Sequence, residues 1–311
     1  MSTDPISPVV HFFAGWLGAS VSCVLLNPLE VVKTRQQSSQ SMHSQLRADR
    51  LMVQILRTEG VAGLYRGLVP HLLGVGPSRA FYFGGYSLIK QRLTSPFWDD
   101  HKTLFHLLSA SLASVVSATI MSPMWVVKTR LQLQVGSAPA VSGGVRYEGI
   151  RDTFRKIYHQ EGFFAFYRGL SASYLGVIET TLQFVLYGEA KRRIIEGRLE
   201  QMQTEVILDD AERRRHVYDD GTAFWTSAGT KLVAAVATYP HEVLRTRMRE
   251  GGLGEGFGVP RYSGLFQAVS LILREEGVRG LYGGMGVHLL RTVPNAAILL
   301  LIVEKITGGE V

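Results

Sequence analysis

Three segments of the chain combine a proline with paired charges, a combination that can act as an ionic switch. They are Asn27–Arg35 (N-P-L-E-V-V-K-T-R), Ser122–Arg130 (S-P-M-W-V-V-K-T-R) and Tyr239–Arg247 (Y-P-H-E-V-L-R-T-R). Proline removes a backbone hydrogen bond and kinks a helix. Glu30 and Lys33, about one turn apart beyond the kink, can therefore turn inward. Three copies, spaced roughly 100 residues apart, predict three related units around one axis.

Two further motifs follow each segment and divide the chain into repeats. Glu-Gly pairs at Glu59, Glu161 and Glu276 fall 31, 38 and 36 residues after the three prolines, and a Tyr-x-Gly triplet begins six residues after each Glu. A second apolar segment comes next. Each repeat is therefore expected to contain a long kinked helix, a short amphipathic piece and a second long helix. The predicted repeats are residues 1–98, residues 99–221 with a charged, solvated and disordered connecting loop over 196–220, and residues 222–311.

The composition favours a membrane protein with a polar interior. Six spans would need ~20 apolar residues each, yet hydrophobic residues make up 46% of the chain and the mean hydropathy is +0.11. Segment 103–122 mixes serines such as Ser109 and Ser117 with Leu, Val and Ala, as expected for a helix between lipid and a water-filled cavity. A soluble bundle is less favoured, because residues 284–303 carry no charge except Arg291. We predict an all-α membrane protein with six transmembrane helices in three pseudosymmetric repeats.

The sequence offers no signature of catalysis. Cys23 is the only cysteine, which excludes an intramolecular disulfide and a cysteine metal cluster. Neither a phosphate loop of the G-x-x-x-x-G-K-S/T type nor an H-E-x-x-H motif occurs. We expect no enzyme activity, no cofactor and no metal. The net charge of +7 favours anionic ligands or anionic lipid. Met1–Val9 has one acid and no arginine, so any targeting signal is expected to be internal.

The triple motif, with its Glu-Gly and Tyr-Arg-Gly echoes, resembles the mitochondrial carrier family over essentially the whole chain. The resemblance implies six transmembrane helices with threefold pseudosymmetry, short matrix helices and alternating access around a central site. It also implies a functional monomer in the mitochondrial inner membrane, with both termini toward the intermembrane space.

Within that family, three stretches look most like the pyrimidine nucleotide carriers: Gly74–Ala80, Ala172–Thr180 and Leu290–Ala296. Trp125, where the family usually has an acid, is shared by the pyrimidine nucleotide, NAD, FAD and folate carriers. The expected function is exchange of pyrimidine nucleotides and their deoxy forms, with an anionic nucleotide rather than a nucleic acid as partner. The alternatives are a carrier for NAD, FAD or folate, or a carrier-fold scaffold that no longer transports.

The family pattern implies a gate on the matrix side. The acid of one repeat pairs with the base of the next, so Glu30 should pair with Lys128 and Glu242 with Lys33. Trp125 cannot form an ion pair, and a cation–π contact with Arg245 would take the place of one. The family also places a bracing glutamine after the motif. The expected matrix gate is Glu30, Lys33, Gln36, Trp125, Lys128, Glu242 and Arg245.

The opposite, cytoplasmic gate departs from the family pattern. The family expects an acid and a base on the second long helix of each repeat. Here the first repeat offers Lys90, the second Lys191 and the third Glu304. We expect at most one pair between repeats, Lys191 with Glu304.

The family's contact points imply the substrate site. They lie seven residues after each Tyr-x-Gly glycine, at Gly74, Gly176 and Arg291. Glu179 is an acid in mid-membrane; its alternative role is a structural ion pair with Arg79 or Lys231. Gly74 could equally serve helix packing. The expected site has Arg79, Lys231 and Arg291 for phosphates, Gly176, Val177 and Glu179 for the base, and Gly74 as a bare backbone surface.

The Tyr-x-Gly turns and the segment Tyr262–Gly264 (Y-S-G) resemble the family's cardiolipin sites, where a helix N-terminus presents N–H groups to a lipid phosphate. The third turn has lost its arginine and should bind more weakly. The expected lipid-binding residues are Arg66, Gly67, Arg168, Gly169, Gly264 and Gly284.

Overall fold

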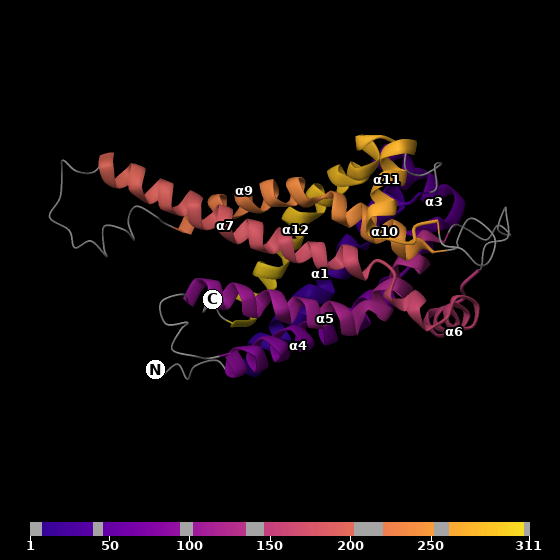
Figure 1. The fold of residues 1–311 in the computed structure, drawn as a ribbon, viewed down its shortest axis with the longest axis horizontal. Helices are drawn as coiled ribbons and strands as arrows, with labels where there is room; N and C mark the ends of the chain where they lie inside the picture. Colours follow the sequence, from indigo (N-terminus) through magenta and orange to yellow (C-terminus); the bar gives the residue numbers. More distant parts are fainter. Residues whose placement is uncertain are drawn as a thin grey trace. The chain divides into compact units, whose positions relative to one another are not determined.

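The computed structural model describes residues 8–39, 46–93, 102–134, 146–201, 220–251 and 261–307, where all regular structure is helical (Figure 1). The first repeat contains α1 (Pro8–Gln37), α3 (Ala48–Leu64) and α4 (Leu68–Leu93). The second contains α5 (Lys102–Leu133), α6 (Ile150–Glu161), the 3-10 helix η2 (Phe163–Tyr167) and α7 (Leu170–Gln201). The third contains α9 (Asp220–Thr238), α10 (Pro240–Glu250), α11 (Leu265–Glu275), the 3-10 helix η3 (Val278–Tyr282) and α12 (Met285–Thr307).

This order matches the predicted long–short–long pattern of helices, with one correction. Residues 196–201 were expected in the connecting loop but belong to α7, and Asp220 at its other end begins α9. Residues 202–219 of that predicted loop lie outside the described residues. The i,i+4 ion pairs Arg193–Glu189 and Arg192–Glu196 support the continuation of the helix.

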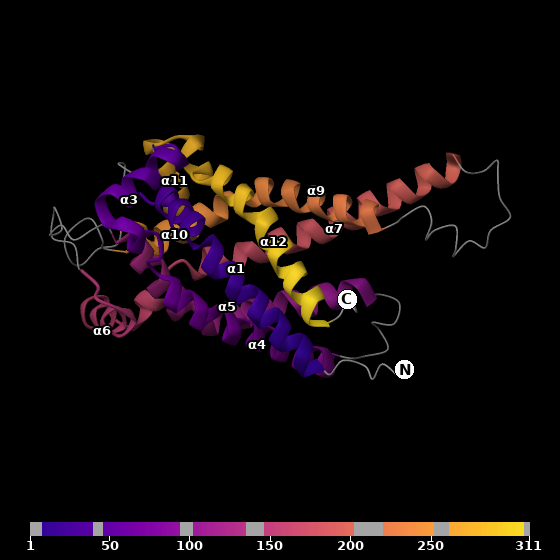
Figure 2. The same ribbon diagram turned by 180° about the vertical axis from the view of Figure 1, so that it is seen from behind.

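The helices form two compact units. The first contains the described residues of Met1–Tyr174 and Pro240–Val311, and the second is Leu175–Tyr239. In the first unit, α1 lies along α12 and α4 lies along α5 (Figure 1, Figure 2). The second unit comprises the rest of α7 together with α9, and these helices border an open groove of about 970 Å³.

Helix α5 separates apolar and small side chains onto two faces. Large apolar side chains from Leu104 to Ile120 are exposed at every fourth residue. Ser109 and Ser117, which suggested a water-filled cavity, are instead buried, and Ser117 donates to the Ser78 carbonyl of α4 at 2.8 Å. The serines thus permit close helix packing. By length and composition, segments Gly15–Gln37 and Leu104–Leu133 could cross a membrane.

The motif prolines act differently in the three repeats. Pro28 lies within α1 and Pro123 within α5, and both helices continue through the proline. In the third repeat α9 ends at Thr238, and α10 begins with Pro240. Proline suits the first position of a helix because no N–H is needed there.

Six motif glycines adopt left-handed backbone. The Glu-Gly glycines have φ of 67–80°, and the Tyr-x-Gly glycines Gly67, Gly169 and Gly284 have φ of 73–77°. A Cβ on each of the latter three would lie 3.0–3.1 Å from the backbone carbonyl of a motif base in the next repeat. Only glycine meets both demands, left-handed φ and close approach. These turns therefore fix how the repeats abut.

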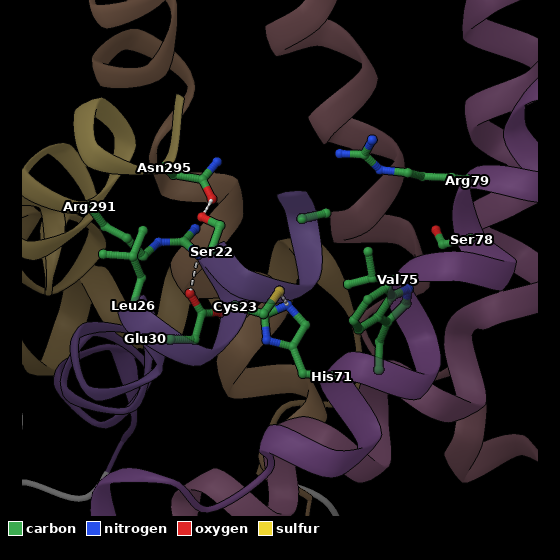
Figure 3. A pocket seen from close by; sticks show the side chains of 12 residues that line it. Ser22, Cys23, Leu26, Glu30, His71, Val75, Ser78, Arg79, Arg291 and Asn295 are labelled. Atoms are coloured by element: carbon green, nitrogen blue, oxygen red, sulfur yellow. Dashed lines mark hydrogen bonds and ion pairs between the residues drawn. The ribbon is translucent and has the colours of Figure 1, made fainter. Parts of the chain in front are cut away.

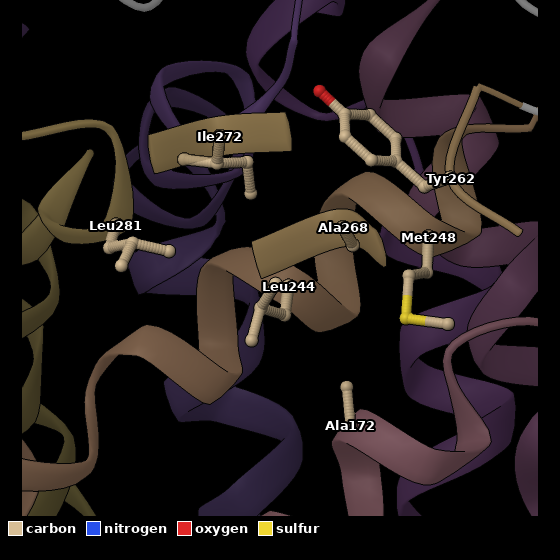
Figure 4. Close-up of a cluster of buried hydrophobic side chains, with 7 residues drawn as sticks. All are labelled: Ala172, Leu244, Met248, Tyr262, Ala268, Ile272 and Leu281. Carbon is tan, nitrogen blue, oxygen red and sulfur yellow. The ribbon is translucent and has the colours of Figure 1, made fainter. Parts of the chain in front are cut away.

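Each short helix docks on the charged end of a long helix through a small apolar cluster. Figure 4 shows the third cluster, in which Ala268 and Ile272 of α11 pack with Leu244 and Met248 of α10. In the first repeat Val31 and Val32 pack with Leu51 and Ile55, and in the second Val126 and Val127 pack with Ile157.

Candidate functional site

Two ion pairs connect the charged ends of α1, α5 and α10. Lys128 Nζ lies 2.9 Å from Glu30 Oε1, and Lys33 Nζ lies 2.6 Å from Glu242 Oε2. All four side chains are at most 12% exposed. These are the pairs that the sequence led us to expect, each joining the acid of one repeat to the base of another.

The expected contact between Trp125 and Arg245 is not formed, and this prediction is wrong. Arg245 pairs with Glu242 of its own helix, three residues earlier. The cation over the indole of Trp125 is Lys128, with Nζ 5.5 Å from the ring centroid. Glu242 is close enough to serve two cations, so Arg245 does not lack an acid. Trp125 instead covers the base of its own motif.

The predicted role of Gln36 is also wrong, because Gln36 does not bond to either ion pair. Its Nε2 donates to the Leu46 carbonyl at 2.8 Å, just before α3. The links between repeats come from the neighbouring position, one residue further along each motif. Thr34 Oγ1 donates to Gln132 Oε1 at 3.1 Å, and Thr246 Oγ1 donates to Gln37 Oε1 at 2.8 Å.

The last arginine of each motif binds the Glu-Gly acid of the same repeat in a two-pronged contact. Arg35 holds Glu59 with N–O distances of 2.6 and 3.0 Å, and Arg247 holds Glu276 at 2.5 and 2.6 Å. Arg130 holds Glu161 in the same way. The three arginines are at most 1% exposed. Bidentate charge-assisted bonds of this kind are strong and directional, so the short helices are tied firmly to the long ones.

The same arginines join the repeats in a ring. Arg35 Nε donates to the Gln132 carbonyl at 3.1 Å, Arg130 Nε to the Arg249 carbonyl at 3.2 Å, and Arg247 Nε to the Gln37 carbonyl at 3.0 Å. Each bond crosses from one long helix to the next. We name these places the α1/α5, α5/α10 and α10/α1 corners.

The α5/α10 corner differs from the other two. Thr129 donates to its own helix, at the Trp125 carbonyl, over 2.9 Å. The residue at the position of the accepting amide is Arg249, whose side chain has no acceptor group. Arg249 is 8% exposed, donates to Ser173 Oγ at 2.9 Å, and has a buried Nε without a hydrogen bond. The same corner carries Trp125 in place of an acid.

A cavity of about 290 Å³ lies between α1, α4, α5 and α12, and Glu30 is among the residues that line it (Figure 3). Arg79 reaches into it from α4 on one side, and Arg291 and Asn295 from α12 on the other. Ser22 of α1 donates to Asn295 Oδ1 at 2.6 Å. Two guanidinium groups beside hydroxyl and amide groups suit an anionic, hydrogen-bonding ligand.

Arg291 is also bound to the gate. Its Nη1 lies 2.5 Å from Glu30 Oε2, and the other oxygen of the same carboxylate holds Lys128. Figure 3 shows the Glu30–Arg291 contact on the side of the cavity opposite Arg79. Glu30 thus neutralises a cation that lines the cavity, while the Nε of Arg291 has no hydrogen-bond partner in the described part of the chain. This link was not predicted, because nothing in the repeat pattern pairs the acid of α1 with a residue of α12.

Comparison with known proteins places this geometry in a family. The profile described as "Mitochondrial carrier protein" matches residues 4–97, 99–198 and 221–308. The chain belongs to the mitochondrial carrier family.

Several relatives of this carrier are similar along nearly their whole length. Solute carrier family 25 member 36-A of Danio rerio is 38% identical over 317 residues, covering 96% of each chain. Solute carrier family 25 member 33 of Homo sapiens is 34% identical, covering 96% of this carrier and 94% of its own chain. The mitochondrial pyrimidine nucleotide transporter RIM2 of Saccharomyces cerevisiae is 34% identical, covering 94% of this carrier and 84% of its own chain.

Gly74 of the carrier serves helix packing. A Cβ at this position would lie 3.2 Å from Trp125 Cη2 and 3.4 Å from Met124 Cγ. The indole of Trp125 thus lies directly against the bare backbone of α4. His71, one turn earlier, meets the same ring edge-on, with centroids 6.0 Å apart. The packing alternative for Gly74 therefore has direct support.

Four predicted substrate residues lie in the second unit. Gly176, Val177 and Glu179 are half-buried positions of α7, and Lys231 is an exposed position of α9. Their contact with substrate stays a prediction. Of the predicted cytoplasmic gate, Lys90 lies on α4 and Lys191 on α7, while the side chain of Glu304 lies outside the described residues.

The predicted lipid-binding arginines have protein partners. Arg66 Nη1 lies 3.1 Å from Glu59 Oε2 and donates to the Gln134 carbonyl at 2.6 Å. Arg168 pairs with Glu161. In the third repeat a Cβ on Gly283 would lie 2.8 Å from the Gln36 carbonyl, which explains the absence of an arginine there. Gly264 precedes α11 and has open space beside it.

Sequence reasoning missed the network around the last motif arginines. Their spacing to the Glu-Gly acids was visible in all three repeats, and a buried charge needs a partner. That signal could have identified Arg35–Glu59, Arg130–Glu161 and Arg247–Glu276. The carbonyl contacts of Gln37, Gln132 and Arg249 could not have been found in this way, because backbone acceptors leave no mark in sequence.

Proposed function

We propose that this carrier exchanges pyrimidine nucleotides, including deoxy forms, across the mitochondrial inner membrane by alternating access. The observation that carries the proposal is the cavity lined by Arg79 and Arg291, together with the Glu30 carboxylate that also holds Lys128 of the next repeat. The cavity offers two planar cations to a phosphate chain, and Glu30 belongs to contacts between repeats that can separate and re-form. The relative RIM2, a mitochondrial pyrimidine nucleotide transporter by name, matches 94% of the chain at 34% identity.

Within this proposal, Arg79, Lys231 and Arg291 bind phosphates. Gly176, Val177 and Glu179 recognise the base, and the buried Gly74 leaves room for Trp125, which lines the cavity. The ion pairs Lys33–Glu242 and Glu30–Lys128 close the matrix side. Cardiolipin binds at the Tyr-x-Gly turns, and the carrier works as a monomer with both termini toward the intermembrane space.

The test is uptake of labelled nucleotide into liposomes containing the purified protein. We expect exchange with internal UTP or CTP, and much weaker exchange with ATP, NAD, FAD or folate. Preferred transport of NAD, FAD or folate would contradict the substrate assignment. The absence of exchange with any of the six, in protein that is folded by its melting curve, would contradict the transport function.

A further inference from the structure

Arg249 is a buried cation that takes part in none of the ion pairs of the gate. At the other two corners the same position holds an amide, Gln37 or Gln132, which accepts a threonine hydroxyl. Arg249 is 8% exposed, and no acid among the described residues forms an ion pair with it. Buried charges in proteins are usually paired. The lack of an acidic partner for Arg249 indicates that its guanidinium pairs with an anion from outside the protein.

The nearby acids are already engaged. Glu242 serves Lys33 and Arg245. Glu161 serves Arg130 and Arg168. Glu250, next in the chain, accepts three hydrogen bonds from Ser38 and Ser39 at 2.7–3.0 Å. Around the α5/α10 corner the cations Lys33, Arg130, Arg168, Arg245 and Arg249 therefore outnumber the acids Glu161, Glu242 and Glu250.

The guanidinium of Arg249 meets the first turn of α7. Its Nη2 donates to Ser173 Oγ, and a Cβ on Gly169 would lie 3.2 Å from Arg249 Cγ. The first turn of a helix has amide N–H groups without intrahelical acceptors and carries positive potential. A buried guanidinium with an unused Nε, set against such a helix end, is a site for a phosphate group.

We propose that Arg249 and the first turn of α7 form a matrix-side phosphate site, which the nucleotide's phosphates occupy when the gate opens toward the matrix. This inference rests on the proposed function. Arg249 lies four residues beyond Arg245 of the gate, and so on its matrix side.

The equivalent position in the first repeat indicates that this site faces the interior. Ser173 follows Gly169 by four residues, as His71 follows Gly67, and His71 lines the cavity. A nucleotide that leaves through the opened gate would therefore pass Arg249. Cardiolipin, which the proposed function also places at this turn, would use the side of the turn that carries Arg168, whereas the nucleotide would use the side that carries Arg249.

The experiment compares the two sides of the membrane in liposomes where one orientation of the carrier has been established by protease accessibility. The apparent KM for UTP is measured from the cytoplasmic side and from the matrix side for wild type, Arg249→Gln and Arg249→Lys. We expect the matrix-side KM of Arg249→Gln to rise about tenfold while the cytoplasmic-side KM rises less than twofold. Arg249→Lys should fall between the two. Gln132→Ala, the matched position at the α1/α5 corner, should change the melting temperature without separating the two sides.

Equal KM changes on both sides, or a raised melting temperature with no KM change, would overturn the proposal and leave Arg249 as a structural residue. A cardiolipin titration followed by thermal shift separates the sources of phosphate. If Arg249→Gln weakens the cardiolipin response and leaves the matrix-side KM unchanged, the phosphate belongs to lipid and the proposal is wrong. If wild-type protein exchanges a different phosphorylated solute, the pyrimidine assignment fails, and the same comparison with that solute still tests Arg249.

Discussion

The α1/α5 and α5/α10 corners are built from the same motif but are held in different ways. At the α1/α5 corner Glu30 serves Lys128 and Arg291, and Thr34 reaches across to Gln132. At the α5/α10 corner Trp125 replaces the acid and Arg249 replaces the amide, so that the arginine-to-carbonyl bond of Arg130 and the glycine contact of Gly169 remain. The difference shows that backbone contacts maintain the ring, while side chains decide how firmly each corner is closed.

This asymmetry has a functional reading. A gate with three equal corners would give no preferred place for opening to begin. With one corner short of ionic contacts, we expect separation to begin between α5 and α10. The α1/α5 corner, tied to the cavity through Arg291, should respond to substrate instead. The following predictions test this division of roles.

The largest effect is expected for Glu30→Gln. It leaves Lys128 and Arg291 without their shared carboxylate, and breaking a buried pair in this way costs about 3–5 kcal/mol. We expect a clearly lowered melting temperature and at least tenfold slower exchange in liposomes. Arg291→Ala is the informative companion, because Glu30 keeps Lys128. It should abolish exchange with a much smaller change in melting temperature. Near-normal uptake by Arg291→Ala would refute its phosphate role.

A smaller effect is expected at Trp125. Trp125→Ala leaves a void against Gly74 and uncovers Lys128; fully buried Trp→Ala changes cost about 3–5 kcal/mol, and this half-buried ring should cost less. Trp125→Phe keeps a ring against α4, so its melting temperature should lie closer to wild type. If the Phe and Ala variants are equally destabilised, packing of the aromatic ring does not stabilise this corner.

The hydroxyl bonds provide a direct comparison of corners. Thr34→Val removes a bond to Gln132 in addition to a bond to the Glu30 carbonyl of its own helix, and loss of the bond between helices should cost about 1 kcal/mol. Thr129→Val removes only a bond within its own helix, and we expect almost no change in melting temperature. In the Arg249→Gln background the threonine gains an amide to reach, so Thr129→Val should become costly there. A double-mutant cycle measures this coupling, and a coupling of zero would show that the corner cannot adopt the arrangement of the other two.

The smallest effect concerns pH at Glu161. Burial would raise its pKa, but hydrogen bonds and charge from Arg130 and then Arg168 outweigh burial and hold the pKa below the ordinary 4.5. A depressed pKa contributes stability above the unfolded value, and that stability is lost as pH falls through the folded value. We therefore expect Glu161→Gln to lower the melting temperature equally at pH 7 and pH 6, with the difference from wild type shrinking only below about pH 4.5. A difference that already shrinks between pH 7 and pH 6 would contradict this assignment.

Much of the helical architecture could be predicted from the sequence. The triple proline motif, the Glu-Gly pairs and the Tyr-x-Gly glycines specify local structure: a helix end, a left-handed turn and a second helix. Such features depend on neighbours within a few residues, and each occurs three times. The repeat pattern also led us to the pairs Glu30–Lys128 and Lys33–Glu242, since an acid and a base at fixed places in each motif have complementary positions in the next repeat.

Only the tertiary structure decided which partners the remaining charges take. Arg245 turned to Glu242 rather than Trp125, Gln36 turned to a loop carbonyl, and Arg291 joined Glu30 across two helices. A long side chain can reach several partners of similar energy, and the choice depends on differences of about 1 kcal/mol set by helix spacing and burial. Every residue has a backbone carbonyl, so the residue type at position 249 does not predict that its carbonyl accepts a hydrogen bond. The unpaired charge of Arg249 became visible only once its neighbours were placed around it.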